Sequence, residues 1–499
     1  MHCAKCHSAS ADAPQGDNWK SVPNINSCAG CHGEAFFDPP SNHGAPAMPA
    51  MGRNSQCANC HGPASNINFC GPNGNQSCRI EAVHTTVNPT TNNPSVPTGA
   101  AIIEYEIDEV TVDATTRQAS IRFRVLRDGM SMMLNPPPAD LSGGPSFLLA
   151  YALPQDGVDE PLDYNNLGLT AGQPTSVSVA NLANGTAGTL TGPDANGFFT
   201  AVTNYAFPVG SMMRAVSLQG YWSQNNVNGV TGNNIPRHAI SVVETAVGDD
   251  ARREIVDSAK CANCHEWFEA HGGNRVYEVQ NCVMCHNPNL SSSGRTTNPT
   301  LVTAAKAAEM EDVLAGNGRL PTNPLRPGPV VGTDPLTWPE ESQNLRELIH
   351  GIHASSMRSN DFAFVRLRGS NITPYNFAHV TYPNEPNRCE ACHMPGTYDT
   401  NLPVGELAGT RIIPSTTPDS RDALLAARAS VPNATDIVTS PGAAACGSCH
   451  DNPAAINHMK LTGAYVDGPR SGLIDGNLES CNVCHGTGRS ADAAVAHGN

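Results

Sequence analysis

Hydrophobic and polar residues alternate along the chain from Ala100 to about Val247. In Ala119–Val125 every second residue is apolar, and this period of two predicts a half-buried strand. Shorter alternations occur at Ile103–Ile107, Val177–Val179 and Met212–Leu218. Turn pairs such as Asn184-Gly185 and Asn196-Gly197 separate these runs. The pattern predicts a β-sandwich or split β-barrel over residues 99–249, a size that is normal for one domain.

Two stretches further along the chain have helical periodicity instead. We expect one helix over Ala304–Leu314 and a second over about Pro339–Ala354. The apolar stripe of the second helix consists of Leu345, Leu348, Ile349 and Ile352, spaced as on one helical face. His350 and His353 are three positions apart on this helix, so they lie on neighbouring parts of one face.

The rest of the chain shows little periodicity and carries a repeated motif, C-x-x-C-H. Its eight copies are Cys3–His7, Cys28–His32, Cys57–His61, Cys261–His265, Cys282–His286, Cys389–His393, Cys446–His450 and Cys481–His485. Three copies lie within residues 1–98 and five within 250–499, whereas 99–249 contains no cysteine. We therefore predict three parts, with the β-domain between two mostly irregular or helical segments organised around the motifs.

C-x-x-C-H is the attachment signature of c-type haem. The two cysteines are about one helical turn apart, so both can bond to one porphyrin while the histidine reaches the iron from the same side. We expect eight covalently attached haems, held by Cys3, Cys6, Cys28, Cys31, Cys57, Cys60, Cys261, Cys264, Cys282, Cys285, Cys389, Cys392, Cys446, Cys449, Cys481 and Cys484. The proximal iron ligands are then His7, His32, His61, His265, His286, His393, His450 and His485. Zinc sites also use C-x-x-C pairs, but they do not require a histidine after every pair.

Each iron also needs a ligand on its other face, and the chain has ten histidines outside the motifs. Spacing favours seven of them as these distal ligands: His43, His84, His271, His350, His353, His458 and His497. Several follow a motif closely; His458 lies eight residues after His450, and His271 lies six residues after His265. An iron with two histidine ligands has no open position, so it moves electrons without binding small molecules.

Three histidines are left without a predicted iron. We expect His238, in a strand-like segment, to be structural, and His379 not to bind iron. His2 adjoins Cys3 and cannot easily reach the far face of that haem, although it could serve another. The distal ligand of the Cys3 haem is therefore not assigned.

The formal net charge of −16 argues against nucleic acid or an anionic membrane as partner and favours cationic or metallic acceptors. The sequence contains no run of 18 apolar residues, so it predicts no helix that spans a membrane. Thioether haems are attached after export, but the chain opens directly on MHCAKCH, so we expect a targeting segment to have been removed or to be missing. An oxidising location outside the cytoplasm also suits a disulfide between the two remaining cysteines, Cys70 and Cys78.

Several longer motifs resemble one known family. HEWFEAHGGNR, CVMCHNPN, LIHGIHAS, VTYPNEPNRCEACH and the closing CNVCH…HGN are similar to segments of the decahaem outer-membrane cytochromes of metal-respiring bacteria, the OmcA/MtrC family. The resemblance covers residues 100–499 well and the first hundred more loosely. In that family two split β-barrels alternate with two pentahaem domains. The resemblance implies a second barrel at 100–247, a second pentahaem domain at 250–499, and distal ligands at His271, His350, His353, His458 and His497.

The start of the chain departs from the family pattern. Its three motifs parallel the last three: Cys3–His7 with Cys389–His393, Cys28–His32 and His43 with Cys446–His450 and His458, Cys57–His61 and His84 with Cys481–His485 and His497. The first two haems of a pentahaem domain and the whole first barrel have no counterpart. We therefore expect an N-terminally incomplete member, with an upstream reading frame that carries two more motifs.

The resemblance and the two-histidine sites together imply an extracellular electron carrier at the cell surface. Its electrons would come from an outer-membrane conduit or another multihaem cytochrome and go to metals, minerals or flavins, and any metal reduction would be outer-sphere transfer. The alternative is a subunit of a polymeric cytochrome filament. A nitrite- or hydroxylamine-type reductase is disfavoured because it needs an open iron, often marked by C-x-x-C-K, and this sequence has no such motif.

Overall fold

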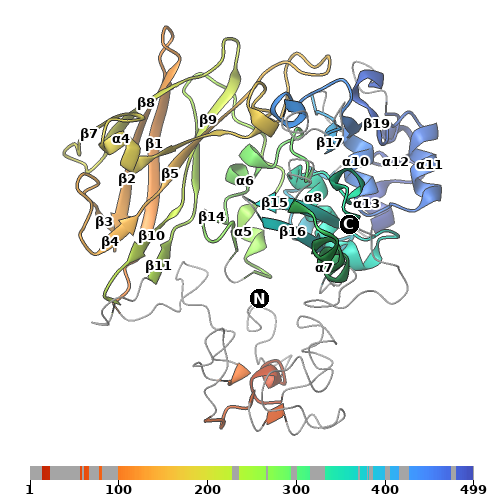
Figure 1. The fold of residues 1–499 in the computed structure, drawn as a ribbon, viewed down its shortest axis with the longest axis horizontal. Helices are drawn as coiled ribbons and strands as arrows, with labels where there is room; N and C mark the ends of the chain where they lie inside the picture. Colours follow the sequence, from red (N-terminus) through yellow and green to blue (C-terminus); the bar gives the residue numbers. More distant parts are fainter. Residues whose placement is uncertain are drawn as a thin grey trace. The chain divides into compact units, whose positions relative to one another are not determined.

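The structure is a computed structural model (Figure 1) and describes residues 14–22, 57–58, 61–66, 78–80, 99–227, 235–265, 268–293, 301–314, 332–368, 371–378, 380, 382, 386–398, 405–414, 426–473 and 479–497. From residue 99 on, one compact unit combines 99–152 with 174–284, and a second combines 153–173 with 285–497. These units cut across the predicted segments 1–98, 99–249 and 250–499, whose boundaries remain predictions.

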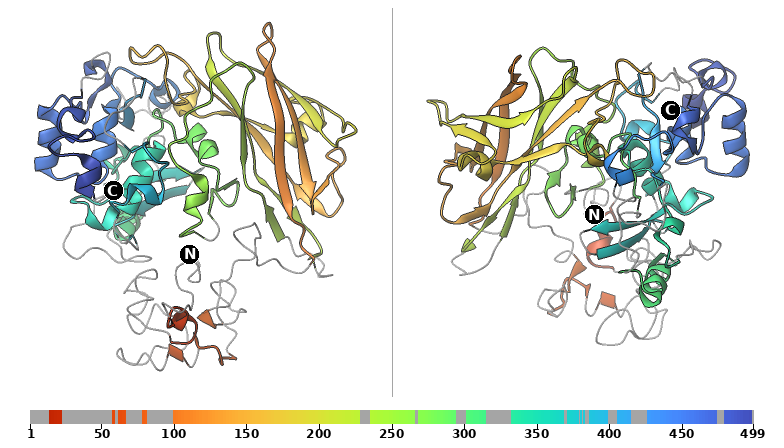
Figure 2. Two further views of the ribbon diagram at one scale, coloured as in Figure 1. Left: turned by 180° about the vertical axis from the view of Figure 1, so that it is seen from behind. Right: turned by 45° about the horizontal axis from the view of Figure 1, so that its top comes forward.

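The first unit is built on three antiparallel sheets, and Figure 2 shows their long twisted strands from two further directions. One sheet has the order β1-β2-β8-β7 with β3 beside β2, the second has the order β12-β9-β5-β6, and the third has the order β11-β10-β4. The strands are β1 (Ile103–Val112), β2 (Gln118–Arg127), β3 (Met130–Ser131), β4 (Leu141–Gly143), β5 (Ser146–Ala152), β6 (Thr175–Ser178), β7 (Gly188–Thr191), β8 (Phe199–Ala206), β9 (Met212–Gln219), β10 (Tyr221–Gln224), β11 (Ile235–His238) and β12 (Val242–Thr245). Among the described residues these sheets are open, without a closed barrel.

The predicted alternation in β2 is confirmed. Every second residue from Ala119 to Val125 is fully buried, so one face of β2 lines the core. There Phe123 packs edge-on against Phe147 of β5, with ring centroids 4.9 Å apart. Because β2 and β5 belong to different sheets, these two sheets face each other in the two-layer arrangement expected of a sandwich.

The sheet that contains β5 and β9 is buried on both faces. Successive residues of β9 from Ala215 to Gln219 are all buried, which is not expected of a strand with one face in water. The hydroxyl of Ser217 donates a buried hydrogen bond of 2.8 Å to Asn281 Oδ1. The second face of the sheet is therefore covered by the segment around Asn281, from the chain that follows the β-domain.

Two predicted strand runs depart from regular alternation. In β1 a register shift between Ile107 and Glu109 interrupts the ladder, and Ile107 is only half-buried. Strand β6 ends at Ser178, whose side chain accepts a hydrogen bond from Asn181 N and caps helix α4 (Val179–Ala183). Val179 therefore lies in a helix because Ser178 offers the backbone a cap.

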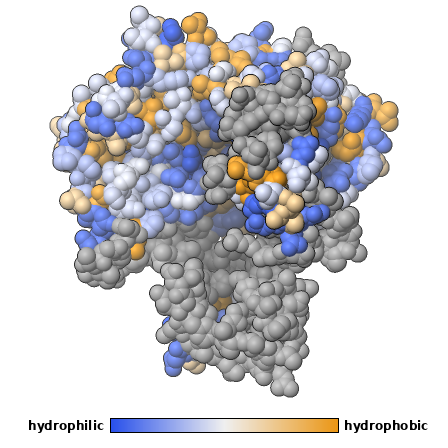
Figure 3. Space-filling view, in the orientation of Figure 1, coloured by the Kyte–Doolittle hydropathy of each residue, from blue (hydrophilic) through white to orange (hydrophobic). Residues whose placement is uncertain are grey.

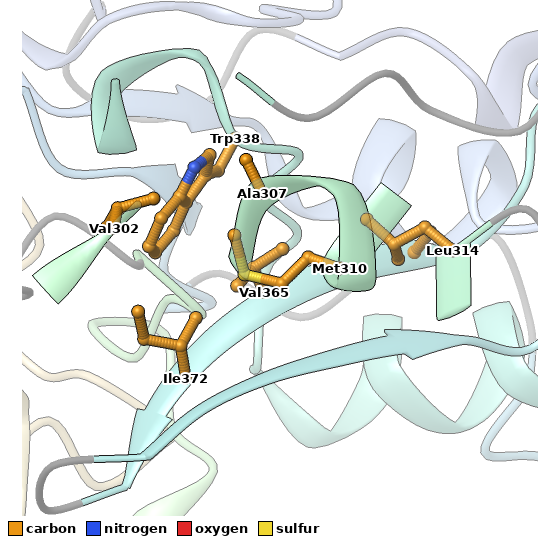
Figure 4. Close-up of a cluster of buried hydrophobic side chains, with 8 residues drawn as sticks. Val302, Ala307, Met310, Leu314, Trp338, Val365 and Ile372 are labelled. Carbon is orange, nitrogen blue, oxygen red and sulfur yellow. The ribbon is translucent and has the colours of Figure 1, made fainter. Parts of the chain in front are cut away.

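The second unit contains a small apolar core of its own (Figure 4). Helix α7 (Ala304–Leu314) has the bounds that were predicted. It lies against the hairpin of β15 (Ala363–Arg368) and β16 (Asn371–Asn376). Met310, Trp338 and Val365 are buried together between them.

Helix α8 is shorter than predicted and spans Leu345–His353. The preceding residues are extended because Ser342 forms a bridge with Ser291, and Asn344 is the N-cap. The remaining elements after residue 250 are α5 (Ser258–Cys261), β13 (Glu269–Ala270), β14 (Arg275–Val276), α6 (Val279–Cys285), β17 (Gly409–Ile412), β18 (Ile437–Thr439), α10 (Pro441–Gly447), α11 (Pro453–Leu461), β19 (Gly468–Pro469), α12 (Asn482–His485) and α13 (Ala493–His497).

Candidate haem sites

Four of the C-x-x-C-H motifs form one turn of helix with the same backbone hydrogen bonds. In each, the amide of the histidine donates to the carbonyl of the first cysteine, at 2.8 Å for Cys261, 2.9 Å for Cys389, 2.8 Å for Cys446 and 2.9 Å for Cys481. The amide of the second cysteine donates to the same carbonyl at 3.1 to 3.3 Å. In a fifth motif, both cysteines of Cys282–His286 lie within α6. The turn expected for haem attachment is therefore present in all five.

Three pairs of histidine rings in the second unit have the same separation. The ring centroids are 6.0 Å apart for His350 and His393, for His450 and His497, and for His458 and His485. A metal–imidazole bond of about 2 Å on each side, with about 1 Å from each nitrogen to its ring centre, gives about 6 Å. The three spacings fit an iron between two imidazoles.

Each pair joins a motif histidine to one outside the motifs. The pairs around the last two motifs are crossed, because His458 lies opposite His485 and His497 lies opposite His450. Proximity in the sequence would have placed His458 with His450. The crossing follows from α11, which starts shortly after His450 and carries His458 over to the other motif.

Hydrogen bonds from Nδ1 orient several of the histidine rings. Nδ1 donates to the carbonyl of Cys78 at 2.7 Å in His61, of Gln343 at 2.8 Å in His286, and of Ala491 at 2.9 Å in His485. His353 Nδ1 bonds in the same way to Ile349 O at 3.0 Å. Since a carbonyl only accepts, Nδ1 carries the proton, and the lone pair on Nε2 can bind a metal.

The two histidines of α8 are held in the neutral form that a metal requires. Burial, together with the neighbouring His393, lowers the pKa of His350 to about 4. Burial also lowers the pKa of His353. The ring of His350 is fixed by a hydrogen bond to the backbone of Ala445, next to the Cys446 motif.

In the first unit, His238 contacts the side chains of Glu269 and Tyr221, and its structural role stays a prediction. It is buried, with its Nδ1 2.6 Å from Glu269 Oε2 and its ring edge-on to Tyr221 at 4.8 Å. Glu269 belongs to β13, which pairs with β14. His271 lies in the turn of this hairpin, exposed and with a φ of 57°. His238 therefore anchors the hairpin that carries His271.

Several predicted site residues lie outside the described residues: Cys3, Cys6, His7, Cys28, Cys31, His32, His43, Cys60 and His84. His2 and His379, for which no iron was predicted, lie outside them as well. Their roles stay predictions. Cys78 is fully buried and disulfide-bonded, but Cys70 is also outside the described residues, so the pairing of these two cysteines stays a prediction as well.

The sequence did not reveal the residues that hold the motifs in place. Asp451, directly after His450, accepts hydrogen bonds from the amides of Ser359 at 2.6 Å and Asn360 at 2.8 Å. The guanidinium of Arg358 donates to the carbonyl of Ser448 inside the motif. An aspartate next to the motif histidine was the only available signal, and it does not identify partners about 90 residues away.

Within the described residues, no group of three or more His, Cys, Asp or Glu side chains is arranged to hold a bare metal ion. No helix among them is long and apolar enough to cross a membrane. Hydrophilic residues cover most of the described surface on the face in Figure 3.

Comparison with known proteins gives one family match. Residues 253–498 match the family model described as outer membrane cytochrome MtrC/MtrF-like, domains II/IV. Among solved structures, the outer membrane decahaem cytochrome OmcA is similar at 16% identity and a TM-score of 0.45, over 100% of this chain and 60% of that one. MtrC from Shewanella baltica OS185 is similar at 17% identity and a TM-score of 0.46, over 97% of this chain and 64% of that one. The chain thus spans less than two thirds of either structure, and no curated protein matches it.

Proposed function

Because the chain belongs to the OmcA/MtrC family of outer-membrane multihaem cytochromes, we propose that it is an electron carrier with eight covalently attached c-type haems. The observation that carries the proposal is the set of three histidine pairs with ring centroids 6.0 Å apart. Each pair combines a C-x-x-C-H histidine with a histidine from another part of the chain. When bound, haem supplies one-electron chemistry that the side chains lack.

The paired histidines define the kind of electron transfer. Two imidazoles on one iron leave no position for a substrate, so electrons leave through the haem edge to an acceptor that is not bound to the metal. His350, His497 and His458 are the proposed distal ligands for the haems of Cys389, Cys446 and Cys481. His353, His271, His43 and His84 are proposed for other haems.

The proposed location is the cell surface, and the match to a family model of outer membrane cytochromes supports it. The proposed electron donors are an outer-membrane conduit or other multihaem cytochromes, and the acceptors are metals, minerals or flavins. A formal net charge of −16 supports cationic or metallic acceptors, because opposite charge speeds the encounter of two molecules. Haem propionates would add negative charge.

A second candidate is a subunit of a cytochrome filament. Electron microscopy of the purified chain separates the two functions. Ordered filaments are required by the filament proposal and are not required by a discrete surface carrier.

The electron-transfer proposal is tested by rapid mixing of the reduced chain with ferric complexes of opposite charge. We expect every haem to be reoxidised by outer-sphere acceptors. A cationic complex should react faster than an anionic complex of similar potential, and the difference should shrink as salt screens the charges. If the chain instead turned over nitrite or hydroxylamine while ferric complexes left it reduced, the electron-carrier proposal would be wrong.

A further inference from the structure

Arg346 lies one helical turn before the proposed iron ligand His350 on α8. Its side chain is largely buried, and Nη1 donates a hydrogen bond of 2.6 Å to Glu406 Oε2. The carboxylate of Glu406 is 4% exposed. A guanidinium in such a place must have its charge balanced and its donors bonded, because removing them from water is costly.

The other edge of this guanidinium is not satisfied by the protein. Within the described part of the chain, the buried Nε and Nη2 of Arg346 have no hydrogen-bond partner. These two nitrogens form the edge opposite the one used by Glu406, and their N–H bonds are parallel. Two parallel donors match the two oxygens of a single carboxylate. The Nε–Nη2 edge of Arg346 therefore indicates a carboxylate as its ligand.

Glu347 is the next carboxylate after Glu406, but it does not reach the guanidinium, and its buried Oε1 has no hydrogen-bond partner among the described residues. Its Oε1 is 3.7 Å from Arg346 Nη2, which is too long for a hydrogen bond. The same oxygen lies so close to Gly409 that a Cβ there would be 2.1 Å from it. Glu347 is also the acid of the first turn of α8, after the N-cap Asn344, where a carboxylate favours the helix terminus.

The surroundings of Arg346 indicate where the missing carboxylate comes from. His350 follows Arg346 by four residues, so both side chains lie on one side of α8. The rings of His350 and His393 are 6.0 Å apart, and their planes differ by 25°. His350 is also hydrogen-bonded to the backbone of Ala445. Arg346 thus lies beside the gap between two proposed iron ligands.

We propose that Arg346 binds a propionate carboxylate of the haem held by Cys389 and Cys392, through a bidentate pair of hydrogen bonds from Nε and Nη2. This inference rests on the proposed function, because it requires a haem between His350 and His393. Arg346 is then a positioning residue. It fixes the rotation of the porphyrin about the axis through the two histidines and neutralises one propionate charge.

A neutralised propionate favours the reduced iron, which carries one positive charge less. Removing Arg346 should therefore lower the potential of one haem. We expect Arg346→Gln to change its reduction equilibrium at least tenfold, which is 59 mV for a one-electron couple. Arg346→Lys keeps the positive charge but loses the two parallel N–H donors. It should therefore lower the potential less than Arg346→Gln does.

The experiment is a potentiometric titration of the full chain with both variants, together with resonance Raman spectra of the propionate bending band. Arg214→Gln is the matched control. Arg214 is similarly buried, but its Nε–Nη2 edge already binds a carboxylate. Nε donates to Asp249 Oδ2 at 2.8 Å and Nη2 donates to Asp249 Oδ1 at 2.5 Å. We expect both Arg346 variants to shift the Raman band and the control to leave it in place.

Three results separate this inference from the proposed function. If both Arg346 variants retain all haems with unchanged potentials and Raman bands, Arg346 does not bind a propionate. If the wild-type peptide that contains Cys389 and Cys392 carries no haem in a mass spectrum, the proposed function fails at this site. If the variants do not fold, a structure of the haem-loaded wild type decides; water or Glu347 on the Nε–Nη2 edge would overturn the inference.

Discussion

His458 lies opposite His485, with ring centroids 6.0 Å apart, although His450 is much closer to it in the sequence. The complementary pair is His450 and His497, at the same separation. In the proposed arrangement, the chain after His485 supplies the second imidazole for the preceding motif. Each of the last two proposed haem sites thus depends on a histidine that follows the motif of the other site.

The crossed pairing predicts an asymmetric effect of two substitutions. In a chain in which Cys481→Ala and Cys484→Ala remove the last haem, His458 has no iron to bind. His458→Ala should then leave every remaining iron low-spin, whereas His497→Ala should create one high-spin iron, at the Cys446 haem. Electron paramagnetic resonance of the oxidised chain distinguishes the two. High-spin iron from His458→Ala and none from His497→Ala would mean that each histidine serves the motif nearest in sequence.

Glu479 predicts a stability effect at the helix that carries the Cys446 motif. Its carboxylate accepts hydrogen bonds from the amides of Gly442 at 2.7 Å and Ala443 at 2.8 Å. It therefore caps α10, whose own N-cap, Ser440, makes no side-chain bond to the helix. Glu479→Ala should lower the free energy of unfolding by about 1 to 2 kcal/mol, the usual cost of losing a cap.

The control for Glu479 is an exposed glutamate. Glu309→Ala removes an ion pair with Lys306 on α7, and the Glu309 side chain is 64% exposed. This change should cost less than about 0.5 kcal/mol. Urea titration followed by circular dichroism measures both variants. Equal effects of the two substitutions would rule out a capping role for Glu479.

Gln155 and Asn289 predict a coupled loss of stability. Their side-chain amides form two buried hydrogen bonds, of 3.0 and 2.8 Å, between parts of the chain 134 residues apart. Either Gln155→Leu or Asn289→Leu removes both of these buried hydrogen bonds from the partner, which should cost about 1 to 3 kcal/mol. The double substitution should cost clearly less than the sum of the two single ones. Additive effects in the double-mutant cycle would mean that the pair contributes no mutual stabilisation.

Asp140 predicts a pH-dependent contribution to stability. It accepts hydrogen bonds from Nη1 and Nη2 of Arg127 at 2.8 and 2.7 Å, and the bond to Arg127 lowers the pKa of Asp140. A carboxyl whose pKa is lower in the folded chain stabilises it above the unfolded pKa of about 3.9 and loses this effect as the pH falls through the folded value. The pair is partly exposed, so the effect should not exceed about 1 kcal/mol.

The test for Asp140 compares the wild type with Asp140→Asn across pH. The difference in urea midpoint should be largest near neutral pH and should vanish in acid below the folded pKa. A difference that stays constant over the whole range would contradict a contribution from the ionised carboxylate.

Local patterns predicted the elements but not the contacts between distant residues. The period of two placed Ala119–Val125 in a buried strand, and helical periodicity gave the bounds of α7. The spacing within C-x-x-C-H predicted the backbone turn that the described motifs form. In each case the sequence pattern and the element that it predicted involve residues close together in the chain.

The features that the sequence did not predict depend on contacts between residues far apart in the chain. The hydrogen bonds between Gln155 and Asn289 place the segment 153–173 in the second unit, although it lies within the predicted β-domain. The crossed histidine pairs depend on how α11 and α13 pack, and spacing alone favoured neighbours. Arg346 gave no signal, because an arginine before a histidine pair is equally compatible with an exposed helix face.

The most direct test of the paired-histidine, eight-haem assignment is a haem count combined with the spin state of the iron. The chain would be produced with its export and haem-attachment machinery, and haem would be measured as the pyridine haemochrome beside electron paramagnetic resonance of the oxidised protein. We predict eight haems per chain with essentially all iron low-spin. Zinc in place of haem at the cysteine pairs, or a substantial high-spin fraction in the wild type, would contradict that assignment.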